Sequence, residues 1–141
     1  MYGIELNFIF CFIGCYFFAL MLQTPKTAIL YASLLGAFGY IVYLLTYKIF
    51  GEVTGCFLGA MFISFFSEVL AKTRKTPSTV FLLPAVISIV PGINLYKTML
   101  FFSLKQNNLA LKMALQTFFS AGAIALAIAL CNLIFNRKKV N

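Results

Sequence analysis

Residues 76–92 read TPSTVFLLPAVISIVPG and place two prolines, Pro84 and Pro91, seven residues apart in an apolar run. Proline has no backbone N–H, so within a helix each ring leaves the carbonyl four residues earlier without its donor. The affected carbonyls belong to Val80 and Ile87. Because seven residues are close to two helical turns, both free carbonyls lie on nearly the same face. We therefore expect an interrupted helix in this segment.

The composition of the whole chain is that of a membrane protein. Of its 141 residues, 62% are hydrophobic and 10% are charged, and the net charge is +8. A soluble domain of this size could not cover so much apolar surface with polar groups. The basic residues cluster between apolar runs and at the C-terminus. We interpret them as topology signals and contacts to the lipid bilayer, and we expect no nucleic-acid binding.

Five apolar segments approach the roughly 20 residues that a helix needs to cross a bilayer core. The sequence predicts an all-α, polytopic integral membrane protein that forms a single transmembrane domain over residues 1–141. The first segment has no basic n-region and no small-x-small cleavage site, so we expect a retained helix rather than a signal peptide. The fourth is interrupted by Pro84 and Pro91-Gly92. The expected helices cover about 6–22, 27–47, 50–71, 79–104 and 109–135.

The distribution of bases predicts the orientation in the cell membrane. If all five segments cross, one side holds seven bases: Lys26, Lys72, Arg74, Lys75, Arg137, Lys138 and Lys139. The other side then holds three: Lys48, Lys105 and Lys112. If the fourth segment enters and returns on one side, the counts become six and four. The positive-inside rule favours five crossings, with the N-terminus outside and the C-terminus in the cytoplasm.

The broken segment is a candidate solute site. Irregular backbone is tolerated at membrane depth only beside protein or a water-filled cavity, and transporters use broken helices to bind their solutes. After Gly92 a half-helix could begin, with Asn94 as its cap and Lys97 in its first turn, which together favour a carboxylate. Two other interpretations stay open: the prolines only kink a packed helix, and Lys97 extends its ammonium to the membrane surface.

Glu68 admits two interpretations. It precedes Lys72 by four residues, the favourable order for an interfacial ion pair on a helix. Alternatively it is a proton-coupling carboxylate, because acids in membrane helices commonly mark ion paths. Glu52 follows Gly51 at the opposite membrane edge, where we expect it to be solvated.

Enzymatic and metal chemistry have few residues to draw on. The chain contains no His and no Asp, and its four cysteines (Cys11, Cys15, Cys56 and Cys131) all fall in apolar runs. No nucleophile–base constellation is visible. We therefore expect no enzyme, no metal site and no cofactor, with the cysteines as small buried side chains.

Three strings in the chain resemble the threonine/serine exporter family, in particular the small separate subunit of its two-component members. They are SEVLA at 67–71, TPSTVFLLPA at 76–85 and VPGINLYKTM at 90–99. Pro77, Pro84, Pro91-Gly92, Tyr96 and Met99 match motif positions. Ala85 stands where the family usually has glycine and Ser88 where it often has proline, so the interruption is expected to be milder here.

The resemblance implies a function and partners. It implies export of small carboxylate-bearing solutes, threonine and serine or a dicarboxylate, coupled to the proton gradient, by a secondary transporter that needs a larger membrane subunit. A homo-oligomer is the other expected assembly, since five helices give little surface for alternating access. The alternative is a membrane scaffold or assembly subunit that does not transport. With the resemblance added, the solute-path candidates are Pro84, Ser88, Pro91, Gly92, Asn94, Tyr96 and Lys97, and Glu68 is the proton-coupling candidate.

Overall fold

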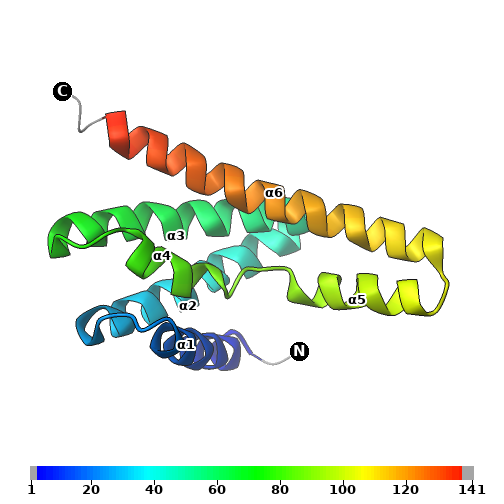
Figure 1. Cartoon of the computed structure of the whole chain (residues 1–141), viewed down its shortest axis with the longest axis horizontal. Helices are drawn as coiled ribbons and strands as arrows, with labels where there is room; N and C mark the ends of the chain where they lie inside the picture. Colours follow the sequence, from blue (N-terminus) through cyan, green and yellow to red (C-terminus); the bar gives the residue numbers. More distant parts are fainter. Residues whose placement is uncertain (1–2, 138–141) are drawn as a thin grey trace.

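The computed structural model describes residues 3–137, and this part of the chain is all-helical, as the sequence predicts (Figure 1). It contains no strand within these residues. The elements are α1 (Ile4–Met21), α2 (Lys26–Phe50), α3 (Glu52–Arg74), α4 (Thr79–Val86), α5 (Gly92–Ser103) and α6 (Asn107–Arg137).

Three of the described helices, α2, α3 and α6, are long and apolar enough to cross a membrane. α1 is shorter and apolar. α4 has 8 residues and α5 has 12. At 1.5 Å per residue these two are about 12 Å and 18 Å long, so neither crosses a hydrocarbon core of about 30 Å by itself.

The long helices form a layered bundle. α2 packs between α1 and α3, and α6 packs along the far side of α3 (Figure 1). α4 lies against α2, α3 and α1, whereas the backbone of α5 packs against that of α6 alone among the described helices. In Figure 1, α5 and the first half of α6 extend beyond the end of the bundle where α2 and α3 meet. The core therefore lies between α2, α3, α4 and α6, and α5, which has no buried residue, lies outside it.

Glycines allow α2 and α3 to approach closely. A Cβ atom added at Gly39 would lie 2.4 Å from Ile63 Cγ1, and one at Gly55 would lie 3.2 Å from the Tyr43 ring. At Gly59 it would lie 2.8 Å from Ile89 Cδ1, at the end of the broken segment. Small residues at such spacings are the usual means of close helix packing in membranes, where the hydrophobic effect contributes little between helices. These contacts fix α3, which carries two of the three acids.

The basic residues near the start of α2 and the end of α3 share one end of the bundle. Arg74 Nη2 donates a hydrogen bond to Tyr31 Oη and stacks on its ring, which ties the end of α3 to the start of α2. Lys72 Nζ lies 4.4 Å from the centroid of the Phe135 ring near the end of α6. We call this the basic end, defined by Lys26, Lys72, Arg74 and Lys75. Lys138 and Lys139 lie outside the described residues.

Candidate functional site

The segment that holds the two prolines forms two helices rather than one. α4 ends at Val86 and α5 begins at Gly92, with residues 87–91 between them. Pro84 lies inside α4, which continues past it; its side chain is fully buried, so packing against α2 and α3 holds the helix across the missing hydrogen bond. Pro91 precedes α5 in the capping position, with φ −75° and ψ 61°. The break therefore lies just before Pro91.

Ser88 anchors the end of α4 to α2. Its hydroxyl lies 2.8 Å from the carbonyl oxygen of Ala85 and 3.2 Å from that of Gly36, so its single O–H can donate to either. A Cβ at Gly36 would lie 3.2 Å from Ala85 Cα, so glycine is needed for this approach. The carbonyl oxygen of Gly36 in α2 is therefore within hydrogen-bond distance of the Ser88 hydroxyl, which lies beside the break.

A cavity of about 340 Å³ lies beside the break, between α2, the start of α3 and the start of α5. We call it the break cavity. Three tyrosines of α2 line one wall, Tyr40, Tyr43 and Tyr47. Five of the seven solute-path candidates line it as well: Ser88, Pro91, Gly92, Asn94 and Lys97.

The other two candidates lie elsewhere. Pro84 lines a separate, smaller cavity beside residues 22–25. The Tyr96 side chain is 66% exposed on the outer surface of α5 and does not line the break cavity. The α5 backbone packs against α6 alone, so the Tyr96 side chain is left largely exposed on the described surface.

Glu52 contributes a carboxylate to the break cavity. It is half-buried, and its two oxygens each accept a hydrogen bond of 2.5 Å, from Asn94 Nδ2 of α5 and from Gln116 Nε2 of α6. The expectation that Glu52 is simply solvated is therefore wrong. Asn94 also has a different role from the expected one: it makes no capping bond at the start of α5 and instead ties that helix to α3.

The donors around Glu52 form a carboxylate-binding arrangement. Two side-chain amides converge on one carboxylate, and the Lys97 ammonium lines the same cavity. Hydrogen bonds to an ionised acceptor are shorter and stronger than bonds between neutral groups. Sequence reasoning missed the two hydrogen bonds of Glu52 because they join residues 42 and 64 positions apart. The scarcity of acids in the chain was the one available signal.

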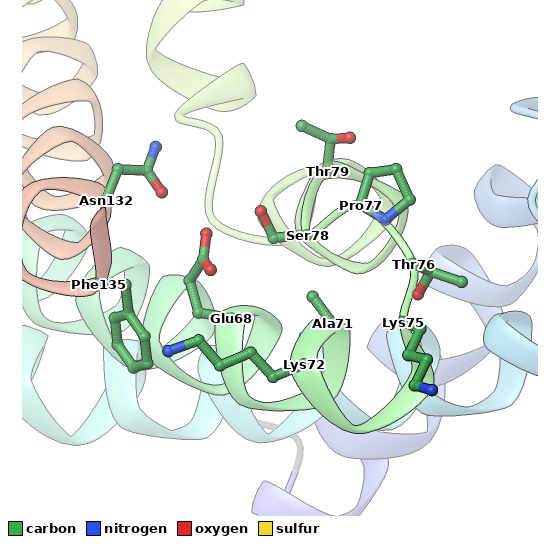
Figure 2. A pocket seen from close by; sticks show the side chains of 10 residues that line it. All are labelled: Glu68, Ala71, Lys72, Lys75, Thr76, Pro77, Ser78, Thr79, Asn132 and Phe135. Atoms are coloured by element: carbon green, nitrogen blue, oxygen red, sulfur yellow. The ribbon is translucent and has the colours of Figure 1, made fainter. Parts of the chain in front are cut away.

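A second, larger cavity of about 720 Å³ lies at the basic end, between the last turns of α3 and α6 and the start of α4 (Figure 2). Glu68 lines it, together with Lys72, Lys75, Ser78, Thr79 and Asn132. The interfacial ion pair that the sequence allowed is not formed: Lys72 places its ammonium over the Phe135 ring instead. We call this the basic-end cavity.

The described residues contain no group of three or more His, Cys, Asp or Glu side chains that could hold a metal ion. The four cysteines are free thiols, and Cys15, Cys56 and Cys131 are buried.

Comparison with known proteins yields one family. The family described as "Threonine/Serine exporter, ThrE" matches residues 7–134, which is most of the chain. No curated protein and no solved structure matches this chain.

Proposed function

Because the chain belongs to the threonine/serine exporter family, we propose that it is a subunit of a secondary transporter that exports threonine and serine or a related small carboxylate-bearing solute. The observation that carries the proposal is the family match combined with the broken segment at residues 87–91, which faces a cavity lined by amide and ammonium donors. Broken helices beside such cavities are a recurring way for transporters to bind a carboxylate.

The break cavity supports a carboxylate solute. Asn94 and Lys97 line the cavity and provide an amide and an ammonium. Glu52, which also lines it, accepts hydrogen bonds from Asn94 and from Gln116, which does not line the cavity. A solute carboxylate can use the same donors when Glu52 moves away or takes up a proton, since a protonated acid accepts fewer hydrogen bonds. Exchange between the protein's own carboxylate and that of the solute is therefore a feasible step.

The proposed topology has five crossings. α2, α3 and α6 are three of them, α1 is the fourth, and α4 and α5 with residues 87–91 together form the fifth. In this proposal Pro91, which precedes α5, keeps the last crossing broken, whereas α4 continues past Pro84. The basic end then faces the cytoplasm by the positive-inside rule, the C-terminus lies on the same side, and the N-terminus lies outside.

Glu68 is the proposed proton-coupling group. Of the three acids, Glu52 is engaged by two amides and Glu5 is exposed at the start of α1. Glu68 is half-buried and lines the larger cavity without an ion pair to Lys72. An acid in this position can take up and release a proton without first breaking a bond to the protein.

Export is proposed to require a larger membrane subunit of the same family, or further copies of this chain. α5 has no buried residue, and Ile93, Met99 and Phe102 are each 70% exposed or more. In a membrane such a surface faces lipid or another protein. A single chain of this size leaves little surface for alternating access, so a second subunit would complete the path.

Counterflow in proteoliposomes tests the function. Purified protein, alone and with any co-purified larger subunit, is reconstituted with unlabelled threonine inside, and uptake of labelled threonine is measured. The expected result is a transient accumulation that Pro91→Ala and Lys97→Ala each reduce about tenfold, because they alter the broken segment and its cation. A non-transporting scaffold would give no accumulation by this chain and normal accumulation by the larger subunit alone.

A further inference from the structure

The basic-end cavity has an arrangement of charges that the described residues around it do not satisfy. It is about twice the volume of the break cavity, about 720 Å³ against about 340 Å³. Both lie in the range typical of small-molecule sites. Glu52 and Glu68 lie sixteen residues apart on α3, so the two cavities are separated by about 24 Å along that helix.

Glu68 is half-buried and, within the described chain, has neither a hydrogen-bond donor nor a cation paired with it. Figure 2 shows its carboxylate pointing into the cavity, toward Ser78 and Asn132. A carboxylate that lines a cavity of this size and has no partner among the described residues can receive a ligand there. The group that satisfies it best is a cation, such as an ammonium.

Lys72 holds a positive charge one helical turn from Glu68. Its ammonium lies 4.4 Å from the centroid of the Phe135 ring, so it is fixed beside the cavity without neutralising Glu68. In Figure 2, Lys75 points away from both side chains. Side chains four residues apart on a helix begin about 5–6 Å from one another. An α-amino acid carries its ammonium and its carboxylate on one carbon, so one small molecule can meet both charges.

Uncharged polar groups complete the cavity. Ser78 and Thr79 at the start of α4 supply hydroxyls, and Asn132 of α6 supplies an amide. Figure 2 shows the Ser78 hydroxyl and the Asn132 amide on the same side of α3 as the Glu68 carboxylate. These groups can exchange hydrogen bonds with a hydroxyl on the ligand's side chain.

We propose that the basic-end cavity is a loading site for a zwitterionic, hydroxyl-bearing α-amino acid. The ligand's ammonium binds Glu68, its carboxylate binds Lys72, and its hydroxyl contacts Ser78 or Asn132. A dicarboxylate fits poorly, because its second carboxylate would lie beside Glu68. The inference rests on the proposed function and deepens it: it selects amino acids over dicarboxylates and adds a second solute site, distant from the break cavity.

Protection of an introduced thiol tests the site locally. Thr79→Cys is placed in the full-length protein in nanodiscs, and its labelling by a membrane-impermeant maleimide is timed with and without ligand. Thr79 is exposed and lines the cavity. Three probes are compared: L-threonine, 3-hydroxybutyrate (threonine without its ammonium) and succinate. L-threonine is expected to slow labelling about fivefold or more, and the other two to change it less than twofold, since only threonine offers Glu68 a cation.

Variants on the same background assign the charges. Glu68→Gln and Lys72→Gln are each expected to raise the threonine concentration needed for half-protection about tenfold. Glu5→Gln, an exposed acid on α1, is the matched control and should leave protection unchanged. Ser103→Cys, exposed at the end of α5 and lining neither cavity, should label at a rate that threonine does not alter. Circular dichroism melts confirm that each variant is folded.

The outcomes separate this inference from the proposed function. Absence of protection by threonine, equal protection by 3-hydroxybutyrate, or protection that survives Glu68→Gln would overturn the loading site, even where counterflow shows export. If counterflow detects no transport of any carboxylate-bearing solute while threonine still protects Thr79→Cys through Glu68, the proposed function fails and the binding site stands.

Discussion

Glu52 and Glu68 stand near opposite ends of α3, and their surroundings differ. At the break cavity, Asn94 and Gln116 from two other helices donate to both oxygens of Glu52. At the basic end, Glu68 faces the larger cavity, and Lys72 one turn away stacks on Phe135 instead of pairing with it. One carboxylate therefore joins α3 to α5 and α6, whereas the other lines a cavity and has no hydrogen bond to a described residue.

The difference in surroundings predicts separate roles for Glu52 and Glu68. A carboxylate whose acceptors are engaged contributes to stability, and removing it leaves donors unsatisfied. A carboxylate without partners contributes little to stability, so stability does not explain why Glu68 lies near Lys72 and Asn132. The comparison therefore predicts that substitution at Glu52 lowers stability, whereas substitution at Glu68 leaves stability nearly unchanged.

The largest expected effect is on the contact between α2 and α3, because α3 carries both Glu52 and Glu68. Gly39→Leu should destabilise the protein by about 3 kcal/mol or more, because even its Cβ would lie 2.4 Å from Ile63 Cγ1, in the α2–α3 contact. Thermal unfolding in detergent and the yield of monodisperse protein measure it. Gly122→Leu is the matched control, since a Cβ there meets nothing within 4 Å. Equal stability of the two variants would mean that α2 and α3 are not in close contact.

At the break cavity, Glu52→Ala should lower the free energy of unfolding by about 2 kcal/mol, because two half-buried amides lose their acceptor. Glu52→Gln should cost less, since its carbonyl oxygen still accepts one bond. We also expect faster proteolysis between α4 and α5, because Glu52–Asn94 is the one side-chain hydrogen bond that joins α5 to the rest of the described chain. Unchanged melting and proteolysis would remove Glu52 from its structural role.

A smaller effect is expected at the end of α4. Ser88→Ala should cost about 1 kcal/mol, because the hydroxyl that links α4 to the Gly36 carbonyl is lost while both carbonyls can keep their helical environment. Thermal unfolding measures the cost. Ser78→Ala, on the basic-end cavity, serves as the comparison, and we expect it to melt like the unmodified chain. A larger loss at Ser78 than at Ser88 would reverse the assignment of which hydroxyl is structural.

The smallest expected effect on stability is at Glu68. Glu68→Gln should change the free energy of unfolding by less than about 0.5 kcal/mol, because no described protein group pairs with the carboxylate. Counterflow of threonine should nevertheless fall about tenfold, since the amide neither carries a proton nor attracts an ammonium. Stability is therefore expected to respond to substitution at Glu52 and not at Glu68. A clear drop in melting temperature would indicate a structural partner for Glu68 and weaken its proposed role.

Much of the architecture follows from local sequence. The apolar runs predict helices in a membrane, because a bilayer leaves the backbone no other way to satisfy its hydrogen bonds over such lengths. Pro91 with Gly92 marks where one segment is not a single helix, since proline constrains its own backbone and that of the residue before it. The strings around Pro77, Pro84 and Pro91 also resemble the family that the comparison then identifies.

The partners of the charged groups depended on tertiary structure. Glu52 meets Asn94 and Gln116 across 42 and 64 residues, and Lys72 meets Phe135 across a similar interval, so no local pattern announces either contact. Tyr96 illustrates the same limit: its motif position is plain in the sequence, whereas its exposure follows from α5 lying against α6 alone. The length of an apolar run and the effect of a proline both act within one segment of the chain. The sequence by itself therefore determined where the helices lie and where one of them is broken. Which side chains a carboxylate reaches depends on how separate helices pack, and only the folded chain decides that.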